Sequence, residues 1–266
     1  MALFFLFASG ISACLGAHWP HQVSRFWLVF SDLAGTVTFG AAFVWVSHLA
    51  LDPFARRYWP DLLISWNRLL AGRVRDPLVG RDILIGAAVA CLQALLWCAF
   101  VTLTRWIRMP EVTPPQGFHA GFLGPPAHAV SAVLYHQFMA VVVALAITLV
   151  LVVARLLLRN KLLALLAAWV SMMFLSFRLE SIDVILFALV SAMLFLVVLV
   201  RFGILAFGTS MFVVDLLYWT ALTLDMSRWY AGRSLAVMLL VLAIAVYGFR
   251  CAVGKKSLLT EFLERA

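Results

Sequence analysis

The sequence predicts an all-α integral membrane protein, a polytopic bundle of about eight transmembrane helices with one amphipathic helix at the cytoplasmic interface. Hydrophobic residues make up 65% of the 266 positions and charged residues only 12%, whereas soluble domains carry about 25% charged residues. The mean hydropathy is +1.05. Apolar segments of about 20 residues, the length that crosses a bilayer as a helix, recur along most of the chain. We therefore expect residues 1–266 to form a single membrane domain.

Polar or charged breaks separate eight apolar segments, and each segment is expected to be one span. The first is short and resembles a lipoprotein signal at Ile11-Ser12-Ala13-Cys14, but no basic residues precede it as they do in a signal peptide. A membrane span is therefore favoured there over lipoprotein processing. The expected spans are Ala2–Ala17, Phe26–Leu51, Asp82–Thr104, Val130–Ala154, Leu162–Phe177, Asp183–Val200, Phe202–Thr223 and Ser234–Phe249.

A basic connector, residues 52–81, separates the second and third spans. Short loops rich in Lys and Arg stay on the cytoplasmic side of a membrane, so the connector is expected inside the cell. Both termini then lie inside, as do most of the 20 Lys and Arg residues. The connector's six arginines are Arg56, Arg57, Arg68, Arg73, Arg75 and Arg81.

Within the connector, Asp61 is expected to cap a short helix that ends at Gly72. Such a helix would lie in the membrane interface, with Trp66 at headgroup depth. Asp76-Pro77 is a start signal for the third span, with Asp as N-cap and Pro at the first helical position, and Asp52-Pro53 repeats it. The expected apolar face holds Leu62, Leu63, Trp66, Leu69 and Leu70, and the polar face Asp61, Ser65 and Arg68.

The connector has two interpretations, a lipid-facing link between spans and a docking surface for a cytoplasmic domain. The amphipathic pattern favours the first, while the density of arginines on one hydrophilic segment suggests the second. The docking interpretation needs side chains that reach solvent. The candidate docking residues are Arg56, Arg57, Trp66, Arg68, Arg73, Arg75, Asp76, Arg81 and Asp82.

Two later spans carry small residues at helical spacing, which allows helices to approach closely in a membrane. We predict packing seams at these positions and no cofactor site, because further ligands at matching spacing are missing. In the third span the small residues recur every four positions, at Gly86, Ala90, Ala94 and Cys98. The fourth span has Ala132, His136, Ala140, Ala144 and Thr148 on one face.

An acidic residue, Asp215, falls near the middle of the seventh expected span. A charged residue there costs about 2.5–3.5 kcal/mol on insertion scales, so it should face the bundle interior beside His136, Gln93 or Arg178. Asp32 lies nearer the outer side of the second span. Asp215 is either an ion, proton or signalling switch or a hydrogen-bonded lock between helices. The candidate intramembrane polar site is therefore Asp215, His136, Gln93 and Asp32.

The remaining segments are polar or irregular. Residues 105–129 form an outer loop rich in Pro and Gly, which favours a connector or lid over a packed domain. Residues 250–266 are expected to form a cytoplasmic tail. The formal net charge of +8 is attributed to inner loops that meet anionic lipid, with no nucleic-acid partner expected.

No catalytic motif is found in the sequence. The Gly-rich phosphate loop, the H-E-x-x-H metalloprotease helix and the Gly-x-Ser-x-Gly nucleophile turn are each missing. Five of the six histidines fall on or near the outer side, but no carboxylate or thiolate shares their spacing. We therefore expect no enzymatic activity, no cofactor and no metal site.

The connector, L-x-D-P-F-x-R-R-x-W-P followed by L-I-S-W-x-R-L-L-A-G-R-x-R-D-P-L-V-G-R-D, resembles a segment of the membrane-spanning C-terminal region of certain bacterial serine/threonine protein kinases. Trp229–Ser234 and Tyr247–Phe249 resemble the last loop and span of that region. The resemblance implies a bacterial inner-membrane location and a cytoplasmic kinase domain. This chain lacks the kinase Gly-rich loop, V-A-I-K, H-R-D and D-F-G motifs, so no catalytic residue carries over.

Two functions are therefore expected from the sequence. The first is a non-catalytic inner-membrane sensor or anchor domain that acts on a cytoplasmic kinase or other signalling domain through its arginine-rich connector. The alternative is a small multi-pass transporter that uses Asp215 and His136. Expected partners are the lipid bilayer, that cytoplasmic domain and a second copy of this chain.

Overall fold

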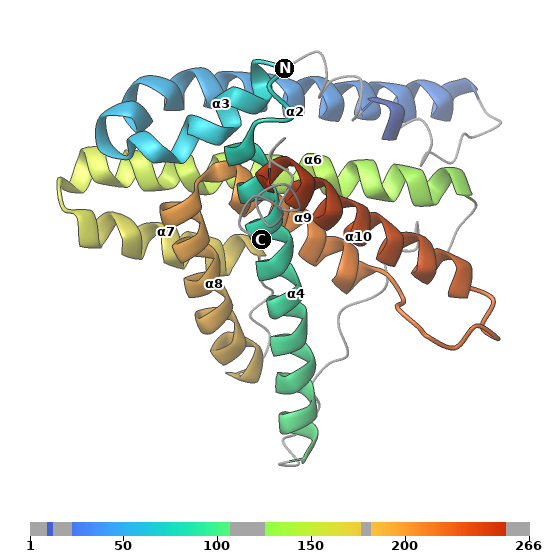
Figure 1. Cartoon of the computed structure of the whole chain (residues 1–266). Coiled ribbons are helices and arrows are strands. Elements are labelled where there is room, and N and C mark those ends of the chain that lie inside the picture. The colour runs from blue at the N-terminus through green and yellow to red at the C-terminus, as the bar shows by residue number, and fades with distance from the viewer. Residues whose placement is uncertain (1–9, 13–22, 107–125, 177–181, 254–266) are drawn as a thin grey trace, which may run out of the picture.

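The computed structural model describes residues 10–12, 23–106, 126–176 and 182–253, and these contain helices and turns but no strand. Figure 1 shows their arrangement. The helices are α2 (Val23–Tyr58), the 3-10 helix η1 (Pro60–Leu63), α3 (Ile64–Leu70), α4 (Pro77–Trp106), α6 (Pro126–Leu158), α7 (Lys161–Ser176), α8 (Ile182–Phe202), α9 (Ile204–Trp219) and α10 (Ala231–Val253).

Five of the helices in the described ranges contain a stretch long and apolar enough to cross a membrane, and α7 and α9 are shorter apolar helices. The prediction of a multi-pass helical membrane protein is thereby confirmed in its coarser form. Expected spans two to eight each coincide with an apolar helix, and most of the first lies outside the described residues. The count of eight spans stays a prediction. The five stretches are Val37–Ala55, Pro77–Thr104, Pro126–Leu158, Val184–Phe202 and Ala231–Val253.

In Figure 1, α2 and α6 lie alongside one another at the top of the view, and α4 and α8 run downward away from them. The most extensive packing joins α4 to α9 and α10, and α6 to α7 and α9. The core lies where these helices meet, and it includes the fully buried Leu145, Phe195 and Phe207.

Pairs of contacts give the relative directions of the helices. Gly40 of α2 faces the Phe138 ring of α6 and Tyr58 lies beneath Arg155, so α2 and α6 run in the same direction. Helices α4 and α9 are also parallel, because Gly86 meets Ala206 and, a few turns on, Gln93 meets Tyr218. Helix α10 opposes α4.

Glycines allow α4 to approach both of its main neighbours. A Cβ atom added to Gly86 would lie 2.5 Å from the Ala206 carbonyl oxygen, and one added to Gly80 would lie 2.5 Å from the Ala252 nitrogen. The predicted seam of α4 is correct for Gly86 and Ala90, which are buried, but Cys98 is exposed. The predicted seam of α6, Ala132 to Thr148, is confirmed because all five of its residues are buried.

The connector is a packed element, and the structure corrects three predictions about its start. Helix α2 continues through Pro53 to Tyr58, so Asp52-Pro53 begins no helix. Trp59, not Asp61, is the N-cap residue of η1, and it makes no side-chain capping bond. Trp66 is 7% exposed and Ser65 only 2%. The face predicted to meet lipid packs instead against protein, because η1 and α3 contact α2, α4, α8 and α9, and Ser65 of the predicted polar face is buried with it.

The end of the connector follows the prediction. Gly72 has a φ of +78°, and its N–H donates to the Leu69 carbonyl while the Arg73 N–H donates to the Arg68 carbonyl, both at 3.0 Å. This pattern is a Schellman motif, in which glycine tolerates the left-handed conformation. The Leu78 N–H donates to Asp76 Oδ1 at 2.9 Å, and α4 begins at Pro77. Asp76 is thus the N-cap that the sequence predicts.

Both ends of the expected outer loop 105–129 are helical, since Arg105 and Trp106 belong to α4 and residues 126–129 to α6. Residues 107–125 lie outside the described part, as does the tail beyond Val253. Proline at position 126 suits the first turn of a helix, which explains why α6 begins before the apolar run at Val130.

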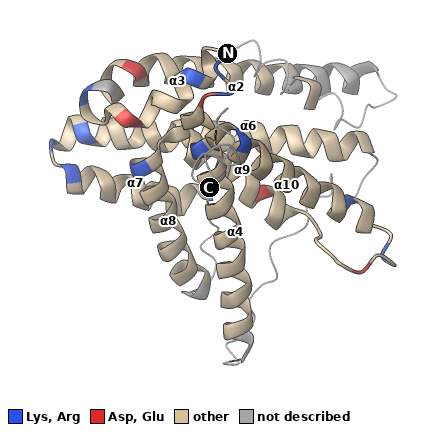
Figure 2. Ribbon diagram, in the orientation of Figure 1, with Lys and Arg blue, Asp and Glu red and all other residues tan. Residues whose placement is uncertain are grey.

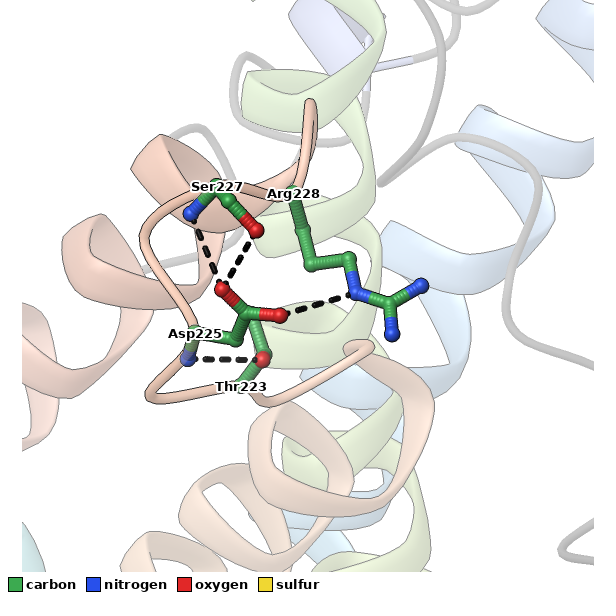
Figure 3. Close-up of polar contacts among 4 residues, drawn as sticks. All are labelled: Thr223, Asp225, Ser227 and Arg228. Carbon is green, nitrogen blue, oxygen red and sulfur yellow. Dashed lines mark hydrogen bonds and ion pairs between the residues drawn. The ribbon is translucent and has the colours of Figure 1, made fainter.

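The loop between α9 and α10 is ordered by Asp225 (Figure 3). The Ser227 N–H and hydroxyl donate to Asp225 Oδ1 at 3.0 and 2.6 Å, and Arg228 Nε donates to Oδ2 at 3.1 Å. These bonds, with Ser227 contributing most, lower the pKa of Asp225 below its usual value. The buried Ser234 hydroxyl accepts from the Thr223 N–H at 2.8 Å and so closes the base of the loop.

Candidate intramembrane polar site

The structure brings His136 and Asp215 together between α6 and α9. Nδ1 of His136 lies 3.3 Å from Oδ2 of Asp215, and the His136 ring is stacked on Trp219 with 6.1 Å between ring centroids. The His136 side chain is 4% exposed and the Asp215 side chain 31%. Of the three partners that the sequence allowed for Asp215, the structure places His136 beside it, and Arg178 lies outside the described residues. The contact is a hydrogen bond when the ring is neutral and an ion pair when it is protonated.

Asp215 lies closer to a helix end than predicted. Helix α9 ends at Trp219, because Thr220 has an extended backbone with φ −98° and ψ 136°. The carboxylate is therefore one turn from the end of α9, and not near the middle of a span that continues to Thr223. Such a position lowers the cost of an acidic group, which is greatest at the centre of the bilayer.

Gln93 belongs to a second buried cluster and is not the partner of Asp215. Its side-chain nitrogen donates to the Ser191 hydroxyl of α8 at 2.5 Å, and its backbone carbonyl accepts from the Tyr218 hydroxyl of α9 at 3.1 Å. Gln93 and Ser191 are both 0% exposed. This cluster joins α4, α8 and α9. Arg178 and the side chain of Asp32, which falls in α2, lie outside what the structure describes.

We predict that Ser191→Ala destabilises the protein by about 1–3 kcal/mol, because it leaves a buried Gln93 amide without its acceptor. Adding Gln93→Leu should restore most of the loss, since two apolar groups of similar shape leave no unsatisfied donor. Thermal unfolding in detergent would measure both variants. A double variant no more stable than Ser191→Ala would contradict the role of this hydrogen bond.

The candidate docking residues separate into exposed and buried groups. Arg57, Arg73 and Arg75 are exposed, and Arg81, which is 51% exposed, pairs with Asp82 at 2.8 Å. Trp66 and Asp82 are buried. Neither side chain is therefore available for docking as predicted: Trp66 lies in the packed connector, and Asp82 lies in α4 beside Arg81. Arg56 lies in α2, and its side chain is not among those described.

Arg68 and Asp76 form a bidentate pair that joins α3 to the start of α4. Nη1 of Arg68 donates to both Asp76 oxygens at 2.9 Å. Burial raises the pKa of Asp76, but the bonds from the Leu78 N–H and from Arg68 lower it by more, so the net pKa lies below the usual value. Asp76 therefore stabilises the fold fully at pH values above the usual pKa of an aspartate. This stabilisation is lost as the pH falls through the lower pKa of the folded state.

Replacing Asp76 with alanine should cost about 1–2 kcal/mol at neutral pH through loss of the cap, with the ion pair adding to it. Asp76→Asn keeps a capping oxygen and should cost less. The difference from wild type should shrink only below about pH 4. Thermal unfolding across pH measures this, and the exposed Asp61 provides a matched Asp61→Ala control. An equal loss in that control would contradict the assignment.

Sequence reasoning missed Ser191, Tyr218 and Trp219, which complete the two polar clusters. Tyr218 and Trp219 follow Asp215 at positions three and four along α9, the spacing that places residues on one helix face. That spacing could have identified Tyr218 and Trp219 from the sequence as neighbours of Asp215. Ser191 had none, because a single serine in an apolar span is unremarkable. Within the described ranges, no group of three His, Cys, Asp or Glu side chains could hold a metal ion.

No protein-family model, curated protein or solved structure matches the chain.

Proposed function

We propose that this chain is a non-catalytic membrane domain that senses or anchors, and that it acts on a cytoplasmic kinase or other signalling domain through its arginine-rich connector. The contact between the α8–α9 junction and the connector carries the proposal. Gly203, at that junction, has a φ of +89°, and a Cβ atom on it would lie 2.7 Å from the Leu62 carbonyl oxygen of η1. The spanning helices thus contact the connector directly.

Helix α9 links this contact to the polar site. It begins beside η1 and carries Asp215 near its other end, where His136 joins it to α6. A rigid helix transmits a displacement along its length, so a change at the His136 contact would move the α8–α9 junction against Leu62. Coupling of this kind requires an element with two arrangements that both sites influence. We propose that α9 is that element.

The surface that would receive a partner consists of Arg57, Arg73 and Arg75. All three are exposed, and arginine binds carboxylates and phosphates through its planar fork of donors. The Gly72 cap and the Arg68–Asp76 pair fix the chain between α3 and α4, where Arg73 and Arg75 lie, and Arg57 lies in the last turn of α2. An acidic or phosphorylated surface of a signalling domain would complement them.

The test is co-purification of the tagged full chain from its native membranes. A protein with a kinase or other signalling domain should accompany the wild type and the Arg228→Glu control, but be lost from Arg57→Glu/Arg73→Glu/Arg75→Glu. Recovery of the same partner by this triple variant, or of no such partner by the wild type, would count against the proposal. Labelling of Arg75→Cys from outside intact cells, in a chain without its four native cysteines, would overturn the orientation.

A second candidate function is a small transporter, which the partly exposed Asp215 beside the buried His136 favours. Acidic and histidine side chains inside membranes often line proton and substrate pathways. Uptake by reconstituted proteoliposomes would test it. Uptake that Asp215→Asn abolishes would favour transport over sensing, and uptake that this variant leaves unchanged would remove Asp215 from any such pathway.

A further inference from the structure

An apolar groove lies between α7 and α8, with a volume of about 1010 Å³. Its lining is leucine-rich along its length and basic at one end. Helix α7 contributes Leu162, Leu166 and Trp169, and α8 contributes Leu189, Met193 and Arg201. The Trp169 indole N–H donates to the Leu189 carbonyl at 3.2 Å. This hydrogen bond joins α7 to α8 at the end of the groove away from Arg201.

The length of the groove matches one leaflet of a bilayer. From Leu189 to Arg201 the lining follows α8 for twelve residues, which is about 18 Å at 1.5 Å per residue. The hydrocarbon core of a membrane is about 30 Å thick, so one leaflet contributes about 15 Å. An acyl chain that entered at the basic end would reach Trp169 close to the midplane.

Positive charge lies at the entrance of the groove. Arg201 lines this end of the groove and is exposed, and the exposed Lys161 directly precedes the lining residue Leu162. Neither takes part in an ion pair with another described side chain. Figure 2 shows further Lys and Arg positions around the turn between α6 and α7, near the upper end of α8. Lys161 also begins α7, and a helix N-terminus favours a negative charge.

We propose that the groove binds an anionic phospholipid from the leaflet on the connector side. One acyl chain lies between α7 and α8, and the phosphate pairs with Arg201 and Lys161. A zwitterionic lipid such as phosphatidylcholine adds its own cation beside its phosphate, so only an anionic lipid brings net negative charge to the two cations. The absence of any acidic residue among the lining side chains also favours an anionic headgroup. This proposal is independent of the proposed function.

The test is lipid binding to the purified full chain by native mass spectrometry. Phosphatidylglycerol should bind more tightly than phosphatidylcholine with the same acyl chains. Arg201→Gln/Lys161→Gln should reduce that preference by about fivefold for each charge removed, because one basic residue near the surface contributes about that factor. Arg228→Gln, which neutralises a charge elsewhere, should keep the full preference, and size-exclusion chromatography would confirm that each variant is folded.

A second variant separates the chain-binding groove from its charged entrance. Met193→Trp should fill the groove and weaken both lipids equally while keeping both cations. Inorganic phosphate alone should not compete, because the acyl chain contributes much of the binding. An unchanged preference in the Arg201/Lys161 variant would overturn the proposal, as would competition by free phosphate. A change of oligomeric state in Met193→Trp, without loss of lipid, would show instead that the groove is a protein interface.

Discussion

Replacing Gly80 with valine should separate α10 from α4 and cost at least about 3 kcal/mol, the upper part of the usual range for overpacking. A Cβ atom at position 80 would lie 2.5 Å from both the Cys251 Cβ and the Ala252 backbone nitrogen. Neither atom is the flexible end of a long side chain, so relief requires the helices to move apart. Gly248 makes the same contact from the other side, with its added Cβ 2.9 Å from the Leu84 nitrogen.

The loss should be large because close approach is the main source of helix association in a membrane. Lipid chains are as apolar as leucine, so van der Waals packing between helices takes the place of the hydrophobic effect. The contact of α4 with α10 is among the most extensive in the fold. Each helix should still insert, because each is apolar enough on its own. The expected product is an inserted protein whose last helix is detached.

Thermal unfolding in a mild detergent would measure the effect, and limited proteolysis of the loop at residues 220–230 would report detachment of α10. Gly35→Val is the matched control, since Gly35 also lies within a long helix but has open space around its Cβ position. It should unfold close to the wild-type temperature. If Gly80→Val were as stable as this control, the predicted α4–α10 contact would be refuted.

The features that could be predicted from the sequence are local or periodic. The apolar runs that become α2, α4, α6 and α8 are visible from composition. The end of α3 at Gly72 and the start of α4 at Asp76 follow from capping chemistry that involves only neighbouring residues. The α6 seam is visible because its small residues recur at helical spacing.

The features that could not be predicted depend on which helices are neighbours. Trp66 has the pattern of an interfacial residue, but it is buried because α3 packs against α4 and α9, neither of which the connector sequence specifies. Asp215 had three possible partners, and its contact with His136 depends on the antiparallel packing of α6 on α9, which the sequence does not specify. Gln93 instead donates a hydrogen bond to Ser191, which lies 98 positions away in the sequence. A single sequence contains the residues of such sites but not their pairing.

Removing the His136 ring should destabilise the protein by about 2 kcal/mol. Breaking a buried ion pair by truncating one partner costs about 3–5 kcal/mol and losing a buried hydrogen-bond partner about 1–3 kcal/mol. Asp215 is 31% exposed, and solvent screening reduces the ion-pair value. His136→Ala also removes the ring that stacks on Trp219. Asp215→Asn should cost less, because an amide oxygen can still accept a hydrogen bond from the imidazole. Thermal unfolding of the two single variants and their combination gives the coupling between the residues.

The same pair allows the two roles of Asp215 to be separated. His136→Leu/Asp215→Leu should recover much of the lost stability, because apolar residues often replace a buried pair at little cost. If the pair only locks α6 to α9, this stable variant should still recruit a cytoplasmic partner through Arg57, Arg73 and Arg75. If the pair is the switch, the variant should fold and yet no longer change its recruitment with stimulus. If the variant is as stable as wild type and its recruitment still responds to the stimulus, His136 and Asp215 have a structural role alone. A displacement of α9 would then have to start at another site.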